Sequence, residues 1–186
     1  MSARLFVAVA LADDDRAALA AWAAEAVGED PGMRLVDPAQ VHLTMAFLGH
    51  RPLDEVDPLR ELVARHAGPR PPMATAGALW LSPRRPHVLT VAVDDRDGVL
   101  EALYGRLWDD LEETIGVERE KRRFKPHVTV ARVRRGWTAP SRRLPDAPAR
   151  ELTGEALVLF RSHLGGRGPA RYEAVERVAL GRAARP

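Results

Sequence analysis

The stretch VHLTMAFLG at residues 41–49 is an apolar run that contains a histidine and a threonine two residues apart. The stretch KPHVTVARV at residues 125–133 repeats this arrangement in the second half of the chain. Short runs rich in β-branched and aromatic residues predict buried strands. The repeat predicts two similar lobes, related by a pseudo-twofold axis, each with one histidine-bearing strand.

Side chains two residues apart on a strand point to the same face of its sheet. His42 is therefore expected to lie with Thr44, and His127 with Thr129. The alternate residues are expected to point into a core, namely Val41, Leu43, Met45 and Phe47 in the first copy and Val128 and Val130 in the second. If the two strands meet about the axis, two imidazoles and two hydroxyls converge in one cleft.

This set of side chains suits phosphodiester cleavage. A neutral imidazole can take a proton from water while a protonated one gives a proton to the leaving oxygen, and an ordinary histidine pKa of about 6.5 lets both forms exist near neutrality. The threonine hydroxyls can donate hydrogen bonds to the nonbridging phosphate oxygens. Neither role requires a metal or another cofactor, so none is expected.

Composition narrows the alternatives. The chain has 186 residues, no cysteine and a formal net charge of +2, so disulfides, thiolate metal sites and a cysteine nucleophile are excluded. Its length fits one domain, and we expect a single bilobal phosphoesterase domain over residues 1–186 that acts as a monomer. The apolar run at 5–12 resembles the core of a signal peptide, but the acidic cluster at 13–15 favours a strand followed by a helix. No run is long enough for a membrane span, and a cytoplasmic location is expected.

Strand and helix patterns alternate along the chain and predict an α+β fold with several antiparallel pairs and outer helices. A helix capped by Asp13 is expected to end at Gly28, a second should cover 52–67 with its regular part starting at Pro58, and a third should cover 97–115. Strands are expected over 5–11, 33–36, 41–48, 73–82, 86–93, 125–133, 156–164 and 171–180.

At this level of detail the chain resembles the two-histidine phosphoesterases, specifically the bacterial and archaeal RNA 2',3'-cyclic phosphodiesterases once called 2',5' RNA ligases. The likeness spans nearly the whole chain. It is carried by RLFVAVAL at 4–11, VHLTMAFLG, FKPHVTVAR at 124–132, and Ser162, Leu164, Gly168 and Tyr172 near the end. Leu35 departs from it, because many relatives have tryptophan at that position.

The resemblance implies a bilobal fold with an open central cleft, and substrates that are RNA ends with a 2',3'-cyclic phosphate or cyclic nucleotides. It implies His42 as proton donor, His127 as proton acceptor, and Thr44 and Thr129 on the phosphate. Arg132 resembles the family's basic residue for phosphate. Simple alternation places the Arg132 side chain on the face of the sheet opposite to that of His127, so a β-bulge or the strand end must redirect it.

Three other functions stay open from sequence. The chain could act on another small cyclic or nucleotide-derived phosphodiester, or could bind RNA without catalysis. A metallohydrolase is disfavoured because no Asp or Glu shares the two histidine faces. His50, His66 and His87 are expected at the surface, Trp22 and Trp108 in the core, and Trp137 in the basic loop 134–150 is the better candidate for an RNA contact.

Overall fold

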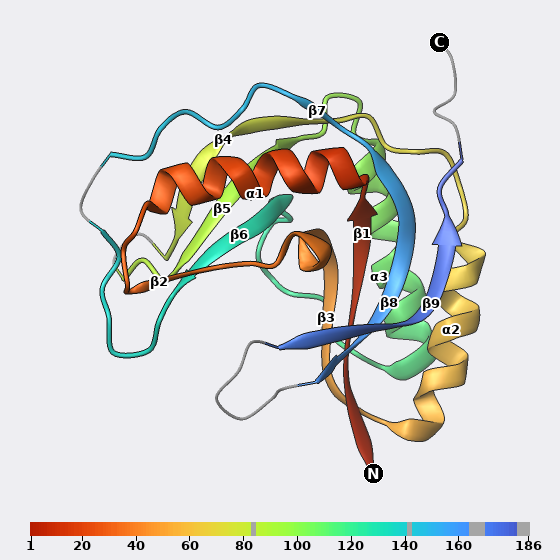
Figure 1. Cartoon of the computed structure of the whole chain (residues 1–186). Coiled ribbons are helices and arrows are strands. Elements are labelled where there is room, and N and C mark those ends of the chain that lie inside the picture. The colour runs from red at the N-terminus through yellow and green to blue at the C-terminus, as the bar shows by residue number, and fades with distance from the viewer. Residues whose placement is uncertain (83–84, 141–142, 164–169, 182–186) are drawn as a thin grey trace.

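The computed structural model describes residues 1–82, 85–140, 143–163 and 170–181. This part of the chain has the α+β fold that was predicted, and its strands form one curled sheet (Figure 1). The helices are α1 (Asp13–Val27), α2 (Val56–Arg65), α3 (Val99–Ile115), and the 3-10 helices η1 (Pro38–Gln40) and η2 (Leu53–Glu55). The strands are β1 (Ser2–Leu11), β2 (Met33–Leu35), β3 (His42–Pro52), β4 (Met73–Leu81), β5 (Val88–Asp94), β6 (His127–Val133), β7 (Glu151–Leu152), β8 (Gly154–His163) and β9 (Arg171–Ala179).

The strand order explains the two-lobed design. The described strands follow the order β7-β4-β5-β6-β3-β1-β8-β9, with β2 paired to β6, and their ladders are antiparallel. β3 and β6 are joined by one backbone pair, whereas β1 and β3 share a long ladder. The sheet therefore divides into two halves at the β3–β6 junction.

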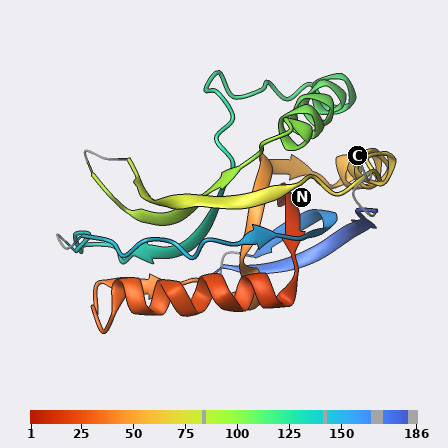
Figure 2. The same ribbon diagram turned by 90° about the horizontal axis from the view of Figure 1, so that it is seen from above.

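The helices cover the two halves from different sides. α1 contacts β2 and β6, whereas α2 contacts α3, β8 and β9. Figure 2 shows α1 on one side of the sheet and α3 on the other. Trp108 on α3 is buried and donates from Nε1 to the Met45 carbonyl of β3 at 3.2 Å, which fixes α3 behind a histidine-bearing strand. Trp22 is buried as well, so both tryptophans occupy the core as predicted.

One apolar core joins both halves. It includes the β1 residues Leu5, Val7 and Val9, together with Leu residues of all three α-helices. A buried leucine contributes roughly 1.5–3 kcal/mol relative to an exposed one, so this continuous core stabilises the halves as a unit. No α-helix of the described ranges is both long and apolar enough to cross a membrane.

Several boundaries differ from the sequence prediction, and those of β3 and α2 have a clear physical reason. β3 does not end at Gly49 but continues to Pro52, because Gly49 takes a φ of 70° and still pairs with Leu5 beyond a bulge at Leu48. α2 starts at Val56 rather than Pro58, because proline is tolerated in the first turn of a helix.

Candidate active site

The two histidine-bearing strands lie side by side at the middle of the sheet. Their single backbone pair joins Leu43 of β3 to Val128 of β6. Both side chains are 0% exposed, so this pair packs on the core side of the sheet. The residues immediately before and after each of them must then point to the opposite face.

Those neighbours are the four residues that the sequence singled out. An antiparallel register around the central pair sets His42 opposite Thr129 and Thr44 opposite His127. All four side chains are partly exposed, in contrast to their buried neighbours. The fold thus brings two motifs that are distant in the chain onto one face, where the histidine of each strand lies opposite the threonine of the other.

Each strand also carries a β-bulge at the same place after its threonine. On β3 the pairing with β1 skips Met45, and on β6 the pairing with β5 skips Val130. A bulge inserts one residue and so reverses the alternation beyond it. The bulged residue and the one after it are consequently both buried on each strand.

The bulges redirect the side chain five positions after each histidine, which is Phe47 on β3 and Arg132 on β6. Arg132 lies near His42, and its positive charge helps to lower the pKa of that imidazole. Phe47 is 57% exposed and its ring lies 6.1 Å from that of Phe6. The expectation that Phe47 points into the core is therefore wrong, and the bulge at Met45 is the reason.

Both imidazoles are oriented by the same backbone contact. Nδ1 of His42 lies 2.7 Å from the carbonyl oxygen of Gln40, and Nδ1 of His127 lies 2.8 Å from that of Lys125. Because a carbonyl oxygen can accept but not donate, Nδ1 carries the proton in each ring. Nε2 of each histidine is then the unprotonated nitrogen of a neutral ring.

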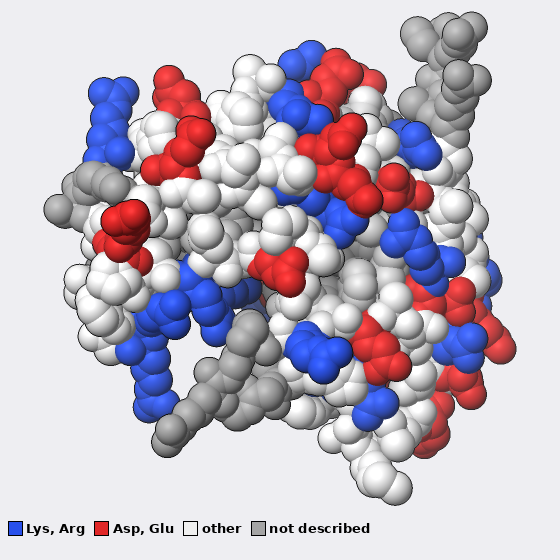
Figure 3. All heavy atoms as spheres, viewed as in Figure 1, with Lys and Arg blue, Asp and Glu red and all other residues white. Residues whose placement is uncertain are grey.

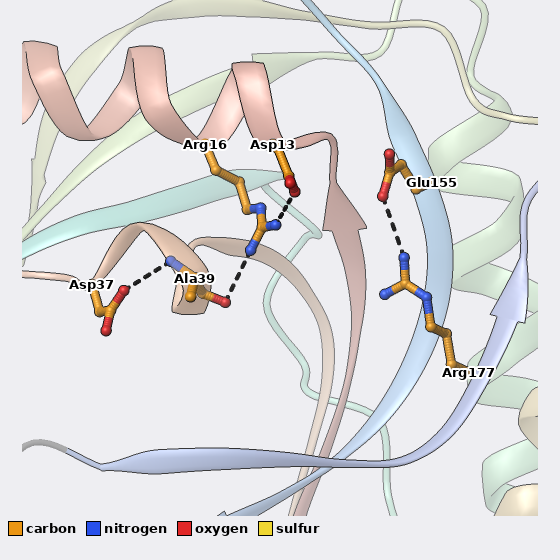
Figure 4. Close-up of polar contacts among 6 residues, drawn as sticks. All are labelled: Asp13, Arg16, Asp37, Ala39, Glu155 and Arg177. Carbon is orange, nitrogen blue, oxygen red and sulfur yellow. Dashed lines mark hydrogen bonds and ion pairs between the residues drawn. The ribbon is translucent and has the colours of Figure 1, made fainter.

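The carbonyl that orients His42 belongs to the short helix η1, whose middle residue Ala39 is held by two contacts (Figure 4). The Ala39 amide donates to the Asp37 carboxylate at 2.9 Å, and Arg16 of α1 donates to the Ala39 carbonyl at 3.1 Å. Arg16 is itself paired with Asp13 in the first turn of α1. The first turn of α1 therefore supports the first histidine through η1.

Aromatic rings surround His42 but not His127 among the described contacts. The His42 ring lies 5.0 Å from Phe6, 5.9 Å from Phe160 and 5.5 Å from Tyr172, the last with edge-to-face geometry. The pKa of His42 is lowered from 6.5 to about 4, mainly by burial and in smaller part by the charges of Arg132 and His127, while the contact with the Gln40 carbonyl opposes the shift. His42 is therefore neutral in the free protein at neutral pH.

A small hollow of about 140 Å³ opens beside His42. Its walls come from β1, the first turn of α1, η1, β8 and β9, and include Arg16, Gln40, Glu155, Phe160, Tyr172 and Arg177. Figure 4 shows Glu155 paired with Arg177 across β8 and β9. A larger hollow of about 470 Å³, between α1 and residues 143–146, contains none of the motif residues.

The four remaining histidines lie outside the two motifs, and one of them corrects a prediction. His50 and His87 are exposed as predicted. The His66 side chain is only 7% exposed and contacts Asp110 of α3 at 3.2 Å, so its prediction as a surface residue is wrong. The α2–α3 contact buries it, and sequence spacing within α2 does not reveal that contact. His163 contacts Glu173 of the neighbouring strand at 2.8 Å.

The basic loop 134–150 runs outside regular structure, with residues 141–142 outside the described ranges. Trp137 is 54% exposed in this loop and packs beside Gly32. Arg150 closes the loop through a 2.6 Å pair with the buried Asp15 of α1. A role of the loop in RNA binding stays a prediction.

Sequence reasoning missed part of this face. Phe6 and Phe160 contribute rings next to His42, and neither belongs to a histidine motif. Phe6 alternates with the buried Leu5 and Val7 along β1, and this was the available signal. Its proximity to His42 follows from the β1–β3 register, which local sequence does not specify.

A curled antiparallel sheet with two bulged histidine–threonine strands meeting at its centre defines the class of two-histidine phosphoesterases that the sequence predicted. The family model of the 2'-5' RNA ligase superfamily matches residues 11–166. The chain belongs to this superfamily.

Its relatives agree with this membership. A curated protein of Thermus thermophilus named RNA 2',3'-cyclic phosphodiesterase is 33% identical over 95% of this chain and 90% of its own length. The crystal structure of the Thermus thermophilus protein TT0787 has a TM-score of 0.81 at 31% identity, and covers 98% of this chain and 100% of that one. The structure of E. coli LigT complexed with 3'-AMP has a TM-score of 0.78 at 25% identity with the same coverage.

Proposed function

We propose that this protein hydrolyses the 2',3'-cyclic phosphate of RNA ends or of nucleotides to a 2'-phosphomonoester, by paired histidine acid and base catalysis without a metal. The observation that carries the proposal is the β3–β6 junction. Its register gathers His42, His127, Thr44 and Thr129 on one face, and the bulge on β6 brings Arg132 to the same face. The names of the curated relatives support the same substrate class.

In the proposed reaction, neutral Nε2 of His127 accepts a proton from water as the water oxygen attacks phosphorus. The bond between phosphorus and O3' breaks, and O3' receives a proton from Nε2 of His42, which leaves the phosphate on O2'. The Thr44 and Thr129 hydroxyls donate hydrogen bonds to the nonbridging oxygens as their negative charge grows. Arg132 adds a positive charge beside them.

The low pKa of His42 places a condition on its role as donor. A group with a pKa of about 4 is mostly unprotonated at pH 7, so His42 must gain its proton as the substrate binds. A phosphate anion beside the ring favours the imidazolium and raises its pKa in the complex. The assignment of His42 as donor and His127 as acceptor rests on the family resemblance and is tested by substrate chemistry below.

The related ligation reaction would use a 5'-hydroxyl in place of water, so that the opening of the cyclic phosphate joins two RNA ends through a 2',5' bond. We also propose that residues 1–186 form one domain that acts as a monomer in the cytoplasm. The continuous core across both halves supports the single domain. Sedimentation of the purified protein would test the monomer.

One assay tests the proposed function. The purified protein is incubated with a 2',3'-cyclic mononucleotide and with a short RNA that ends in a 2',3'-cyclic phosphate, and the position of the product phosphate is read by ³¹P NMR. We expect a 2'-phosphate from both. Binding of the RNA without turnover would identify a noncatalytic RNA-binding module, and turnover of neither compound but of another cyclic phosphodiester would identify a different substrate.

A further inference from the structure

Two arginines face each other across the short β2–β6 ladder. Arg34 of β2 is the direct partner of Arg132 of β6. The adjacent pair, Met33 and Val133, packs toward the core, with Met33 5% exposed. Arg34 therefore lies on the face that carries Arg132 and the two histidines. Like charges directly opposite each other on a sheet are destabilising unless an anion compensates them.

A third arginine approaches the same place from the other half of the sheet. Arg4 alternates with the buried Ala3 and Leu5 along β1, so its side chain lies on the face of Phe6. Burial lowers the pKa of Arg132, and the charges of Arg34 and Arg4 lower it further while Tyr172 opposes them. Arg34 and Arg4 thus each lie close enough to repel the charge of Arg132 beside the proposed site.

Within the described residues these three arginines have no carboxylate partner. Ten ion pairs are found there, of which eight involve other arginines and two involve histidines. The segments 83–84, 141–142, 164–169 and 182–186 contain no Asp or Glu side chain that could supply one. Figure 3 shows Lys and Arg side chains gathered over the region of β2 and β6. Such an uncompensated group of cations is suited to bind a polyanion.

We propose that Arg34 and Arg4 form a subsite for the internucleotide phosphate that joins the terminal nucleotide to the rest of an RNA chain. This inference rests on the proposed function. Arg132 lies near His42 and serves the reacting cyclic phosphate, whereas Arg34 lies on the adjacent strand β2, about 4.8 Å away in the sheet. A cyclic mononucleotide lacks the internucleotide phosphate, so the subsite favours oligonucleotides over mononucleotides.

The experiment compares two substrates in two variants. Arg34→Gln and Arg4→Gln are assayed on a 2',3'-cyclic mononucleotide and on an RNA trinucleotide that ends in a 2',3'-cyclic phosphate. For each variant we expect kcat/KM on the trinucleotide to fall about tenfold, mainly through KM, while kcat/KM on the mononucleotide changes less than about threefold. Arg106→Gln, an exposed arginine of α3, removes the same charge far from the sheet face and should change neither value.

Salt dependence gives an independent measure. The dissociation constant of a fluorescent trinucleotide that ends in a 2'-phosphate is measured by anisotropy at several salt concentrations. Loss of one phosphate contact should reduce the slope of log Kd against log salt by about 0.7 for single-stranded RNA in Arg34→Gln, but not in Arg106→Gln. The binding measurement needs no turnover.

Equal losses on both substrates would overturn the subsite, because Arg34 would then act on the reacting phosphate. Unchanged trinucleotide kinetics in both variants would also overturn it, as would an equal effect of Arg106→Gln. Failure of the wild-type protein to hydrolyse either substrate would instead remove the proposed function. The anisotropy slopes would then still decide whether Arg34 contacts a phosphate.

Discussion

The strands β3 and β6 carry the same motif and the same bulge, yet they give their histidines different surroundings. His42 lies among Phe6, Phe160 and Tyr172, and burial lowers its pKa to about 4. His127 has the same Nδ1 contact to a carbonyl but no ring within the described aromatic pairs. A repeated local sequence therefore fixes the direction of a side chain, whereas the strands packed beside it set the chemistry of its proton.

The redirected residues differ in the same way. The bulge on β3 presents the exposed ring of Phe47, and the bulge on β6 presents the guanidinium of Arg132. The β3 half of the face thus gains an aromatic ring, and the β6 half gains a positive charge. A nucleotide has both an aromatic base and an anionic phosphate, so the two halves are complementary to different parts of the proposed substrate.

The largest expected effect comes from removing either imidazole. His42→Ala and His127→Ala should each lower kcat on a 2',3'-cyclic nucleotide by roughly 10² to 10⁴, the usual loss for a general acid or base. Circular dichroism should show that both variants keep the fold. His87→Ala is the matched control, because its Nδ1 also contacts a carbonyl two residues earlier while its side chain is exposed. Near-normal turnover in one folded variant would exclude that histidine from the mechanism.

The two histidines should differ when the leaving group needs no proton. On a nitrophenyl phosphodiester, His42→Ala should recover much of the lost rate because a nitrophenolate departs unprotonated, whereas His127→Ala should stay slow because water still requires a base. The pH profile of His42→Ala on this substrate should lack the fall at high pH, which in the wild type reflects loss of the proton from the acid. Recovery in His127→Ala instead would reverse the roles.

The threonines sharpen the comparison at a smaller scale. Thr44→Val and Thr129→Val keep the β-branched shape and delete the hydroxyl, so each should cost about 1–3 kcal/mol of transition-state stabilisation. This corresponds to roughly 5- to 150-fold in kcat/KM. The buried Thr90, which donates to the Leu79 carbonyl at 3.0 Å, offers a Thr→Val control whose effect should be on stability rather than on turnover. Unchanged kinetics in both site variants would leave the threonines with a structural role.

The asymmetry of burial should appear in the stability of the free protein. The folded pKa of His42 is about 4 and its unfolded value is near 6.5, so the unfolded state binds more protons between these values. The stabilisation from neutral His42 is therefore complete above pH 6.5 and is lost as the pH falls toward 4. Its full size is up to about 3 kcal/mol, less the part that solvent access to the partly exposed ring removes.

Urea unfolding of wild type and His42→Ala between pH 7.5 and 4.5 measures this contribution. The difference in unfolding free energy between the two proteins should shift in favour of the variant as the pH falls. A difference that stays constant over this range would mean that His42 keeps an ordinary pKa. His127→Ala provides the comparison from the other strand.

The smallest expected effect is that of chelation. Because the proposed reaction uses side-chain acid and base alone, activity should change little after exhaustive treatment with EDTA and should need no ATP. Loss of turnover that one divalent cation restores would overturn this mechanism. Metal analysis of the active protein completes the measurement.

Much of this face could be read from the sequence. Period-two alternation around each motif predicted that His42 lies with Thr44 and His127 with Thr129, because the pleat of a strand fixes that relation locally. The same alternation wrongly predicted that Phe47 points into the core. For Arg132 it could place the side chain beside His127 only if a bulge or the strand end redirected it, and the sequence did not say which. The bulge itself depends on how many residues the partner strand supplies, which a single strand does not encode.

The sequence by itself determined the strand and helix order, the buried stripes of α1 and α3, and the shared face of the histidine and the threonine within each motif, because these follow from backbone periodicity. Only the tertiary structure decided which strands become neighbours. The β3–β6 contact, the rings around His42, the α2–α3 contact that buries His66 and the opposed Arg34 and Arg132 all join residues distant in the chain. Such contacts are selected by packing of the whole core, and they set burial and charge, on which proton affinity and anion binding depend.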